Sequence, residues 1–328
     1  MKWLVADIGG TNARFALWQR EEQKRGQKGQ PEGQLTGIRT LSVAHYTSFE
    51  DALEDYLQGI QPDAACFAVA GPVITGPIMD TDFTFTNSPW QISCPLIKAR
   101  FGFKVLHLIN DFTAQSWALA ELDLSALMQI GGGMRNTEAP RVALGPGTGL
   151  GVGALIKAQG HWTPVSGEGG HMGFKPHDAL DLELLKLYWQ ETPRISDEKM
   201  LAGFGLETLY RLICTIEGHK IKALSAKQII TQALEAKEPF ALKVVDRHLY
   251  HLGALAGDLA LLFSAYGGVY LSGGIASALA PRLKTGHLRE GFENKDRLKA
   301  MIKDIPIYLV KDDKAALLGA MRALEAQL

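Results

Sequence analysis

The chain has 328 residues and a mass of 35.7 kDa, which is long enough for two domains of ordinary size. Hydrophobic residues make up 46% and charged residues 21%, and the formal net charge of −1 excludes a global basic field that would attract nucleic acid or anionic membranes. The three cysteines contain no Cys-x-x-Cys pair, which argues against a disulfide framework and favours a reducing compartment.

The first predicted element is a buried strand at about residues 3–8, which leads into Asp7-Ile8-Gly9-Gly10-Thr11-Asn12-Ala13-Arg14 and a second strand at 12–19. Two glycines can take backbone angles closed to other residues, so the chain can double back here. The turn would point N–H groups and the side chains of Thr11 and Asn12 into a concavity suited to phosphate, with Asp7 able to orient a hydrated Mg²⁺. The alternative is a tight hairpin in which these side chains only complete the turn.

The segment from Glu21 to Gln34 is polar and rich in glycine, which predicts a mobile hairpin tip. Its lysines and arginine would also suit nucleic acid, but Glu21, Glu22 and Glu32 dilute that charge. Beyond it we expect a strand at 36–43, a helix that begins after Ser48 and extends to about residue 58, and a strand at 64–69.

A polar pair, Asn110 and Asp111, ends the next predicted strand, and residues 112–122 have helical character. The pair would lie at the carboxyl end of that strand, where ligands collect in open α/β sheets. An amide can donate and accept hydrogen bonds, and a carboxylate can take a proton from an attacking hydroxyl. The alternative is that Asp111 only caps the following helix.

A second glycine loop, Gly145-Pro146-Gly147-Thr148-Gly149-Leu150-Gly151, lies between predicted strands at 141–144 and 152–156. The repeated construction predicts two related halves, each presenting a hairpin loop to one nucleotide. Neither loop has the lysine of a P-loop, and neither has the spacing of a dinucleotide fingerprint leading into a helix.

Three glycines surround Glu168 and His171 in Ser166-Gly167-Glu168-Gly169-Gly170-His171 and leave the loop open enough for both side chains to point the same way. Glu-x-x-His can be half of a metal site, but zinc needs further ligands, and the cysteines are widely spaced. Hydrogen bonding to sugar hydroxyls therefore suits the pair better than a metal, with a structural histidine as the alternative.

The remaining elements are mainly helical. We expect helices at about 178–191, 205–216 and 224–235, a long helix from Pro239, strands at 269–272 and 305–310, and a final amphipathic helix at 314–328. No basic segment followed by an apolar stretch opens the chain, and its longest apolar helix is too short to cross a bilayer, so we expect a cytoplasmic protein.

Five segments, in order, resemble the bacterial glucokinase family, the branch of the sugar kinase, actin and Hsp70 superfamily that lacks the zinc-binding cysteines of ROK sugar kinases. They are residues 7–14, 108–112, 145–151, 167–171 and 267–275, the last containing Ser272-Gly273-Gly274-Ile275. The resemblance implies an α/β, two-lobed actin-like ATPase (ribonuclease H-like) fold with a cleft between the domains. The expected small domain is 1–111 plus about 312–328, and the large domain is 112–311.

The resemblance also assigns roles to residues. It implies that phosphates are bound by Asp7, Gly9, Gly10, Thr11 and Asn12 in the first loop and by Gly147, Thr148 and Gly149 in the second, with Gly273 and Gly274 against the adenosine. It implies that glucose is bound by Asn87, Asn110, Asp111, Glu168, His171 and Glu198. Asp111 would be the catalytic base at the 6-hydroxyl, and Asp7 would hold Mg²⁺ indirectly.

The implied activity is that of a glucokinase, which transfers the γ-phosphoryl group of Mg²⁺-ATP to the 6-hydroxyl of glucose, uses no zinc and forms a homodimer. One alternative is a kinase of another hexose or amino sugar, which the same four polar residues, Asn110, Asp111, Glu168 and His171, would serve. Another is a sugar-responsive regulator or an ATPase switch. We expect no nucleic-acid or membrane partner, because no charge pattern in the sequence favours one.

Overall fold

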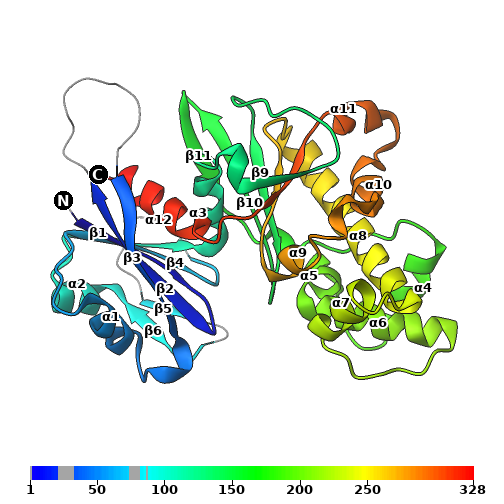
Figure 1. Cartoon of the computed structure of the whole chain (residues 1–328), viewed down its shortest axis with the longest axis horizontal. Helices are drawn as coiled ribbons and strands as arrows, with labels where there is room; N and C mark the ends of the chain where they lie inside the picture. The colour runs from blue at the N-terminus through cyan, green and yellow to red at the C-terminus, as the bar shows by residue number, and fades with distance from the viewer. Residues whose placement is uncertain (1, 21–32, 74–81, 86–87) are drawn as a thin grey trace. The chain divides into compact units, whose positions relative to one another are not determined.

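The computed structural model of the chain describes residues 2–20, 33–73, 82–85 and 88–328. Two compact units are present: the first runs to Leu122 and resumes at Asp313, and the second covers Asp123–Asp312 (Figure 1). Each unit has its own sheet and its own hydrophobic core.

The sheet of the first unit has the order β3-β2-β1-β4-β7 among the described residues. Strands β1, β2 and β3 form an antiparallel meander, and β1, β4 and β7 run parallel. Their bounds are β1 (Lys2–Ile8), β2 (Asn12–Arg20), β3 (Gly33–Ser42), β4 (Ala64–Val69) and β7 (Val105–Asn110), with a separate pair β5 (Asp82–Thr84) and β6 (Gln91–Ser93).

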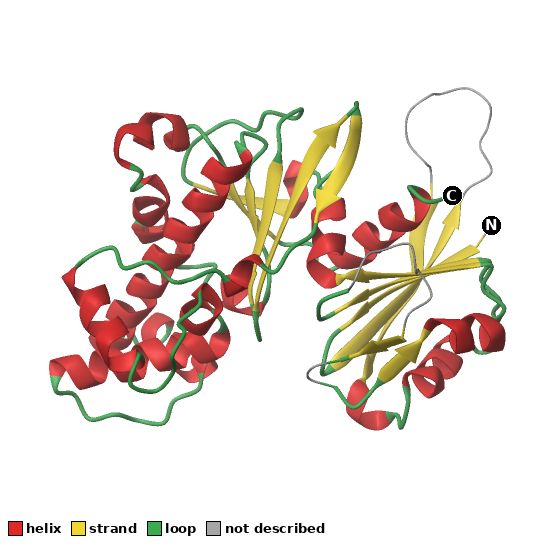
Figure 2. Cartoon of the chain, turned by 180° about the vertical axis from the view of Figure 1, so that it is seen from behind, coloured by secondary structure: helices red, strands yellow, loops and turns green. Residues whose placement is uncertain are grey.

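Helices cover both faces of this sheet (Figure 2). One face packs on α1 (Phe49–Leu57) and α2 (Cys94–Phe101), and the other packs on α12 (Ala315–Glu325), which lies beside α3 (Asp111–Ala118). Ser48 accepts the Asp51 N–H, so α1 begins where its sequence predicts. The last helix thus supplies apolar residues to a sheet made from the beginning of the chain.

The second unit repeats this arrangement. Its sheet has the order β11-β10-β9-β12-β13-β8, with an antiparallel meander β9-β10-β11 followed by parallel β12 and β13. The bounds are β8 (Leu127–Ile130), β9 (Arg141–Pro146), β10 (Leu150–Ala158), β11 (His161–Val165), β12 (Val269–Leu271) and β13 (Ile307–Val310). Five strands in each unit therefore share one order and one set of directions.

A set of helices packs on the second sheet and on one another. They are α4 (Ala179–Tyr188), α5 (Asp197–Leu201), α6 (Gly203–Glu217), α7 (Ala226–Leu234), α8 (Pro239–Phe263), α9 (Gly274–Ala278), α10 (His287–Glu293) and α11 (Lys299–Lys303). Glu238 caps the first turn of α8, and Ser225 and Gln228 form a capping box at α7. Among the described residues, four short 3₁₀ turns, including Gly169–His171, lie in this unit, and a fifth, Val43–His45, lies in the first.

Several expectations need correction. The first unit extends beyond the expected limit at residue 111 because α3 packs on α12, where Gly319 lies directly against the Ala114 carbonyl. Helix α3 ends at Ala118, and the next residues continue as tighter turns with i→i−3 hydrogen bonds. Gly33 and Gln34 belong to β3 and not to a hairpin tip, whereas residues 21–32 of that segment lie outside the described residues.

The other predicted helices and strands are confirmed to within a few residues at each end. Among the described residues, no helix is both long enough and apolar enough to cross a membrane.

Candidate functional site

The first glycine turn joins β1 to β2 as the sequence predicts. Gly9 N–H donates to the Asn12 carbonyl at 2.9 Å and closes the turn, and the side chains of Thr11 and Asn12 are exposed. Neither Gly9 nor Gly10 has a positive φ, so the expected use of backbone angles closed to other residues is wrong here. Thr11 and Asn12 stay free to meet a ligand, which is what a phosphate loop requires.

Asp7 lies at the end of β1, opposite Arg14 on β2. Burial raises the pKa of the Asp7 carboxyl above its usual value, and the nearby Arg14 guanidinium acts in the opposite direction. Arg14 itself is held by the Thr40 hydroxyl and by both the carbonyl and the carboxylate of Asp313. Asp7 therefore lies two residues before Gly9, beside a guanidinium that is itself held in place.

Asn110 and Asp111 lie at the junction of β7 and α3. The Asn110 side-chain oxygen accepts the N–H groups of Phe112 and Thr113, at 2.9 and 3.2 Å, so Asn110 and not Asp111 is the N-cap of α3. Its amide nitrogen donates to the Gly71 carbonyl and to Asp111 Oδ1, both at 3.0 Å. The amide thus orients Asp111, and a sugar hydroxyl would have to replace one of these bonds.

The parallel strands bring these two sites to one edge of the first sheet. Ile8 pairs with Val69, and Val69 pairs with Asn110, so the ends of β1, β4 and β7 form a single row. Two strand spacings place the glycine turn about 10 Å from Asn110. Asp111 also lies in the first turn of α3, where the positive end of the helix dipole stabilises a carboxylate.

In the second unit, the glycine loop between β9 and β10 is held in place by its neighbours. Gly147 N–H donates to the Gly149 carbonyl at 2.8 Å, and Gly203 N–H donates to the Gly147 carbonyl at 2.9 Å. Thr148 at its tip is exposed. Leu150 N–H donates at 3.0 Å to Glu198 Oε2, a side chain that has no distinctive motif around it in the sequence.

The loop with Glu168 and His171 lies against the start of β10. A methyl group on Gly170 would overlap the Leu150 carbonyl oxygen, and one on Gly169 would lie 2.8 Å from the Val152 side chain. These glycines therefore also allow close backbone approach, a role that the sequence analysis did not predict. Glu168 and His171 are both exposed, as ligands for a sugar need to be.

The segment 194–198 fixes both His171 and Glu198. Arg194 donates to the His171 carbonyl, and Asp197 N–H donates to the Met172 carbonyl, at 2.8 and 2.9 Å. Ser196 caps α5 by accepting the Lys199 N–H, which places Glu198 in the first turn. His171 Nδ1 then lies 3.9 Å from Glu198 Oε1.

The turn after β12 completes this group of segments. Gly273 has φ near +90°, and a side chain there would meet the Pro146 carbonyl oxygen at 2.6 Å. Ser272 N–H donates to the Leu144 carbonyl at 3.0 Å. Gly273 and Gly274 therefore lie beside the base of the second glycine loop, and both are exposed.

Sequence reasoning located most of the polar side chains in these two groups but missed the backbone of Leu150 and Gly203. Backbone N–H groups have no sequence signal of their own. Ser196 followed by Lys199 offered only an ordinary helix start for the segment around Glu198. Asn87, the remaining predicted sugar ligand, lies outside the described residues.

No group of three or more histidine, cysteine, aspartate or glutamate side chains is arranged to hold a metal in residues 2–20, 33–73, 82–85 and 88–328. Cys66, Cys94 and Cys214 are each buried. The donors at the first turn are one carboxylate, Asp7, with the exposed Thr11 and Asn12. This set fits a Mg²⁺ that keeps most of its waters and arrives with a nucleotide.

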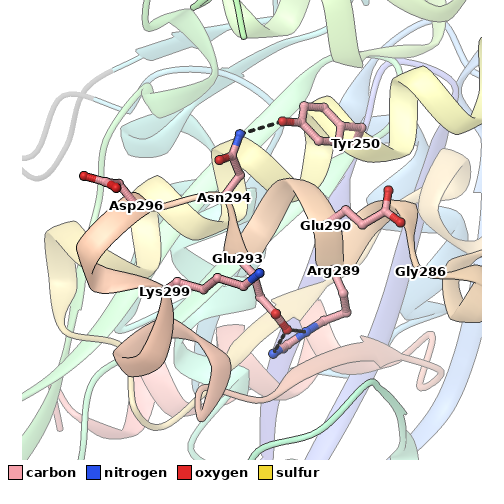
Figure 3. Close-up of a pocket in the computed structure, with 8 residues that line it drawn as sticks. All are labelled: Tyr250, Gly286, Arg289, Glu290, Glu293, Asn294, Asp296 and Lys299. Atoms are coloured by element: carbon pink, nitrogen blue, oxygen red, sulfur yellow. Dashed lines mark hydrogen bonds and ion pairs between the residues drawn. The ribbon is translucent and has the colours of Figure 1, made fainter. Parts of the chain in front are cut away.

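A separate surface pocket of about 490 Å³ lies among α8, α10 and α11 (Figure 3). Two pairs of its polar side chains are engaged with each other: Asn294 donates to the Tyr250 hydroxyl at 2.7 Å, and Arg289 pairs with Glu293. None of the predicted site residues lines it. The two groups of loops, and not this pocket, are the candidate functional site.

Sequence comparisons with known proteins match this chain to a single family. A family model described as Glucokinase matches residues 4–327. The chain is 39% identical over 324 residues to the glucokinase of Caulobacter sp. (strain K31), covering 98% of this chain and 94% of that protein. It is 36% identical over 319 residues to the glucokinase of Mesorhizobium japonicum, covering 96% and 89%.

Solved structures give the same picture of the fold. A glucokinase from an Antarctic psychrotroph has a TM-score of 0.86 at 33% identity, covering 99% of both chains. A ROK family glucokinase from Streptomyces griseus, in complex with glucose and AMPPNP, has a TM-score of 0.63 at 18% identity and covers 100% of both chains. The mixed α/β fold is thus shared with sugar kinases of both branches.

Proposed function

The chain belongs to the glucokinase family and phosphorylates glucose, and we propose that it transfers the γ-phosphoryl group of ATP to the 6-hydroxyl with Asp111 as the base. One observation carries the assignment of the base. Asp111 is held by Asn110 at the same sheet edge as the first glycine turn, about two strand spacings away. A carboxylate there can meet a hydroxyl that faces bound phosphate.

Each substrate is assigned its own residues. Glucose hydroxyls are bound by Glu168, His171 and Glu198 in the second unit and by Asn110 and Asp111 in the first. Asn87 belongs to this set through the family resemblance alone. ATP phosphates meet the backbone and hydroxyl donors of the two glycine loops, and adenosine lies against Gly273 and Gly274. The exposed tips of these loops support this division.

The reaction is an in-line phosphoryl transfer. The 6-hydroxyl oxygen attacks the γ-phosphorus, its proton passes to the Asp111 carboxylate, and the bond from the γ-phosphorus to the bridging oxygen of ADP breaks. The N–H groups of Gly9 and Gly147 close their own turns, so those of Gly10, Thr11, Thr148 and Gly149 are the ones that stabilise the charge developing on the phosphate oxygens. When bound with the nucleotide, Mg²⁺ neutralises part of the phosphate charge, and Asp7 is the residue that would orient its waters.

The proposed glucose ligands come from both units of the protein. In the two-lobed, actin-like architecture, glucose would bind in a cleft between the units and draw them together, because its ligands come from both. The protein would act as a homodimer in the cytoplasm. Light scattering on the purified protein measures the dimer directly.

The function is tested by incubating the protein with Mg²⁺-ATP and a panel of hexoses and amino sugars, and following ADP formation. Glucose should be the preferred acceptor by kcat/KM. A higher kcat/KM for an amino sugar or another hexose would reassign the substrate within the same site. Repeating the assay with ADP or polyphosphate in place of ATP identifies the donor.

Saturating glucose is expected to reduce the radius of gyration in small-angle X-ray scattering without any nucleotide, because its proposed ligands lie on both units. An ATP analogue alone should reduce it less. Identical profiles with and without glucose, in protein shown to bind glucose by calorimetry, would mean that the pocket is formed in advance.

The purified protein is expected to contain no stoichiometric zinc, because no cysteine cluster accompanies His171 in the sequence. Mg²⁺ should be needed only with the nucleotide, so glucose binding should survive treatment with EDTA. Elemental analysis by mass spectrometry checks the first statement. About one zinc per chain would make His171 a metal ligand.

A further inference from the structure

The backbone of Leu150 is contacted by two segments that the proposed function assigns to the sugar. Its N–H donates to the Glu198 carboxylate at 3.0 Å, and its carbonyl lies directly against Gly170 in the loop of Glu168 and His171. Leu150 is the first residue of β10 and immediately follows Gly147–Gly149, the second phosphate loop. The backbone of a single residue thus lies between the two substrate sites of this unit.

Glu198 has one carboxylate oxygen toward each site. Oε2 accepts the Leu150 N–H, whereas Oε1 faces the His171 ring, 3.9 Å from Nδ1. The side chain is 22% exposed, so a ligand can reach one oxygen while the other stays on the loop. A charged acceptor makes a stronger hydrogen bond to a backbone N–H than a neutral one does.

The phosphate loop has a second attachment to the same segment. Gly203 N–H donates to the Gly147 carbonyl at 2.9 Å, and Ala202 N–H donates to the Glu198 carbonyl, also at 2.9 Å. Gly149 lies under the Glu198 carboxylate, because a side-chain carbon there would be 2.7 Å from Oε2. The position of the phosphate loop is therefore set by the turn that carries Glu198.

We propose that Glu198 couples the glucose site to the second phosphate loop: glucose held at Oε1 fixes the carboxylate whose Oε2 orders Leu150 and the loop before it. This inference rests on the proposed function and adds a positioning role to a sugar ligand. A bound sugar lowers the cost of ordering the loop, and by linkage a bound nucleotide must raise glucose affinity by the same factor.

Isothermal titration calorimetry tests the coupling. The Kd of glucose is measured alone and with saturating Mg²⁺-AMPPNP, and the Kd of Mg²⁺-AMPPNP is measured alone and with saturating glucose. In the wild type, each ligand is expected to tighten the other by at least about fivefold, and the two factors should agree.

Two variants remove the hydrogen bond between Leu150 and Glu198 in different ways, and each has a matched control. Glu198→Ala removes both contacts, and its control His171→Ala removes a sugar ligand but leaves the Leu150 bond. Gly149→Ala pushes the carboxylate off Leu150, and its control is Gly147→Ala, where an added methyl would meet no atom within 4 Å. Both Glu198→Ala and Gly149→Ala should reduce the coupling factor to within about twofold of one, while both controls keep the wild-type factor.

The outcomes separate the two proposals. Either variant, Glu198→Ala or Gly149→Ala, could bind glucose more weakly and still keep the coupling factor of the wild type. Glu198 would then be a sugar ligand only, and the coupling would come from closure of the units. A coupling factor within twofold of one in the wild type would also overturn the inference. Neither result touches the proposed function, which fails instead if the wild type does not phosphorylate glucose.

Discussion

Asp111→Asn is expected to lower kcat by about 10²–10⁴ while the KM for glucose changes by less than about tenfold. Asparagine keeps the size of the side chain and an oxygen that can accept the Phe112 N–H and the Asn110 amide, as Asp111 Oδ1 does now. It cannot take the proton of the 6-hydroxyl. The loss should therefore appear in the chemical step and not in binding.

Steady-state kinetics at saturating glucose and ATP measures this effect. Glu168→Gln is the matched control, because it makes the same carboxylate-to-amide change at an exposed sugar ligand and leaves Asp111 and its hydrogen bonds in place. A smaller loss of kcat is expected from it than from Asp111→Asn. If Asp111→Asn turns over at a rate near that of the wild type, Asp111 is not the base.

Asp197→Asn is expected to stabilise the protein at pH 8, by between about 1 and 4 kcal/mol, and to leave stability unchanged near pH 4. Burial raises the pKa of the Asp197 carboxyl from 3.8 to about 7, with Lys175 lowering it and Asp258 raising it. Only 6% of Asp197 is exposed, so solvent screening is weak.

The direction of this change in stability with pH follows from the protonation of the Asp197 carboxyl in the folded and unfolded chains. Below about pH 4 it is protonated in both folded and unfolded chains and costs nothing. As the pH rises towards 7, the unfolded chain releases this proton and the folded chain keeps it, so stability is lost, and the loss is complete above 7. Asparagine stays neutral throughout and avoids this loss.

Thermal unfolding of wild type and variant at pH 4 and pH 8 measures the difference. Asp123→Asn is the control, because Asp123 is exposed in the same unit and its side chain caps no helix. It should shift the midpoint equally at both pH values. A variant of Asp197 that is less stable than the wild type at pH 8 would show that the ionised carboxylate is stabilising.

Local signals explain which parts of the site could be predicted. The first glycine turn follows a short apolar strand, and Asn110-Asp111 ends another, so strand patterning alone places both at strand ends. The parallel pairing of β1, β4 and β7 then brings them to one edge. That pairing is a long-range property, but the α/β pattern restricts the choices.

The second group of loops could be predicted only in part. Gly145–Gly151 and Glu168–His171 have recognisable glycines, although at Gly149, Gly169 and Gly170 the reason is close approach of neighbouring atoms and not unusual φ angles. Glu198 lies in the five-residue helix α5, which is too short for periodicity to reveal. Its contact with Leu150 joins residues 48 positions apart, and only the tertiary structure shows it.

The return of α12 to the first sheet has a consequence for protein synthesis. One face of that sheet, with Trp3, Val5 and Cys66, is covered by Leu317, Met321 and Leu324. On the ribosome these covering residues emerge only after the whole of residues 123–312, whose own core is complete without them. The second unit can therefore fold before α12 is made, while the strands of the first sheet keep an apolar face exposed to chaperones and to neighbouring nascent chains until α12 has emerged.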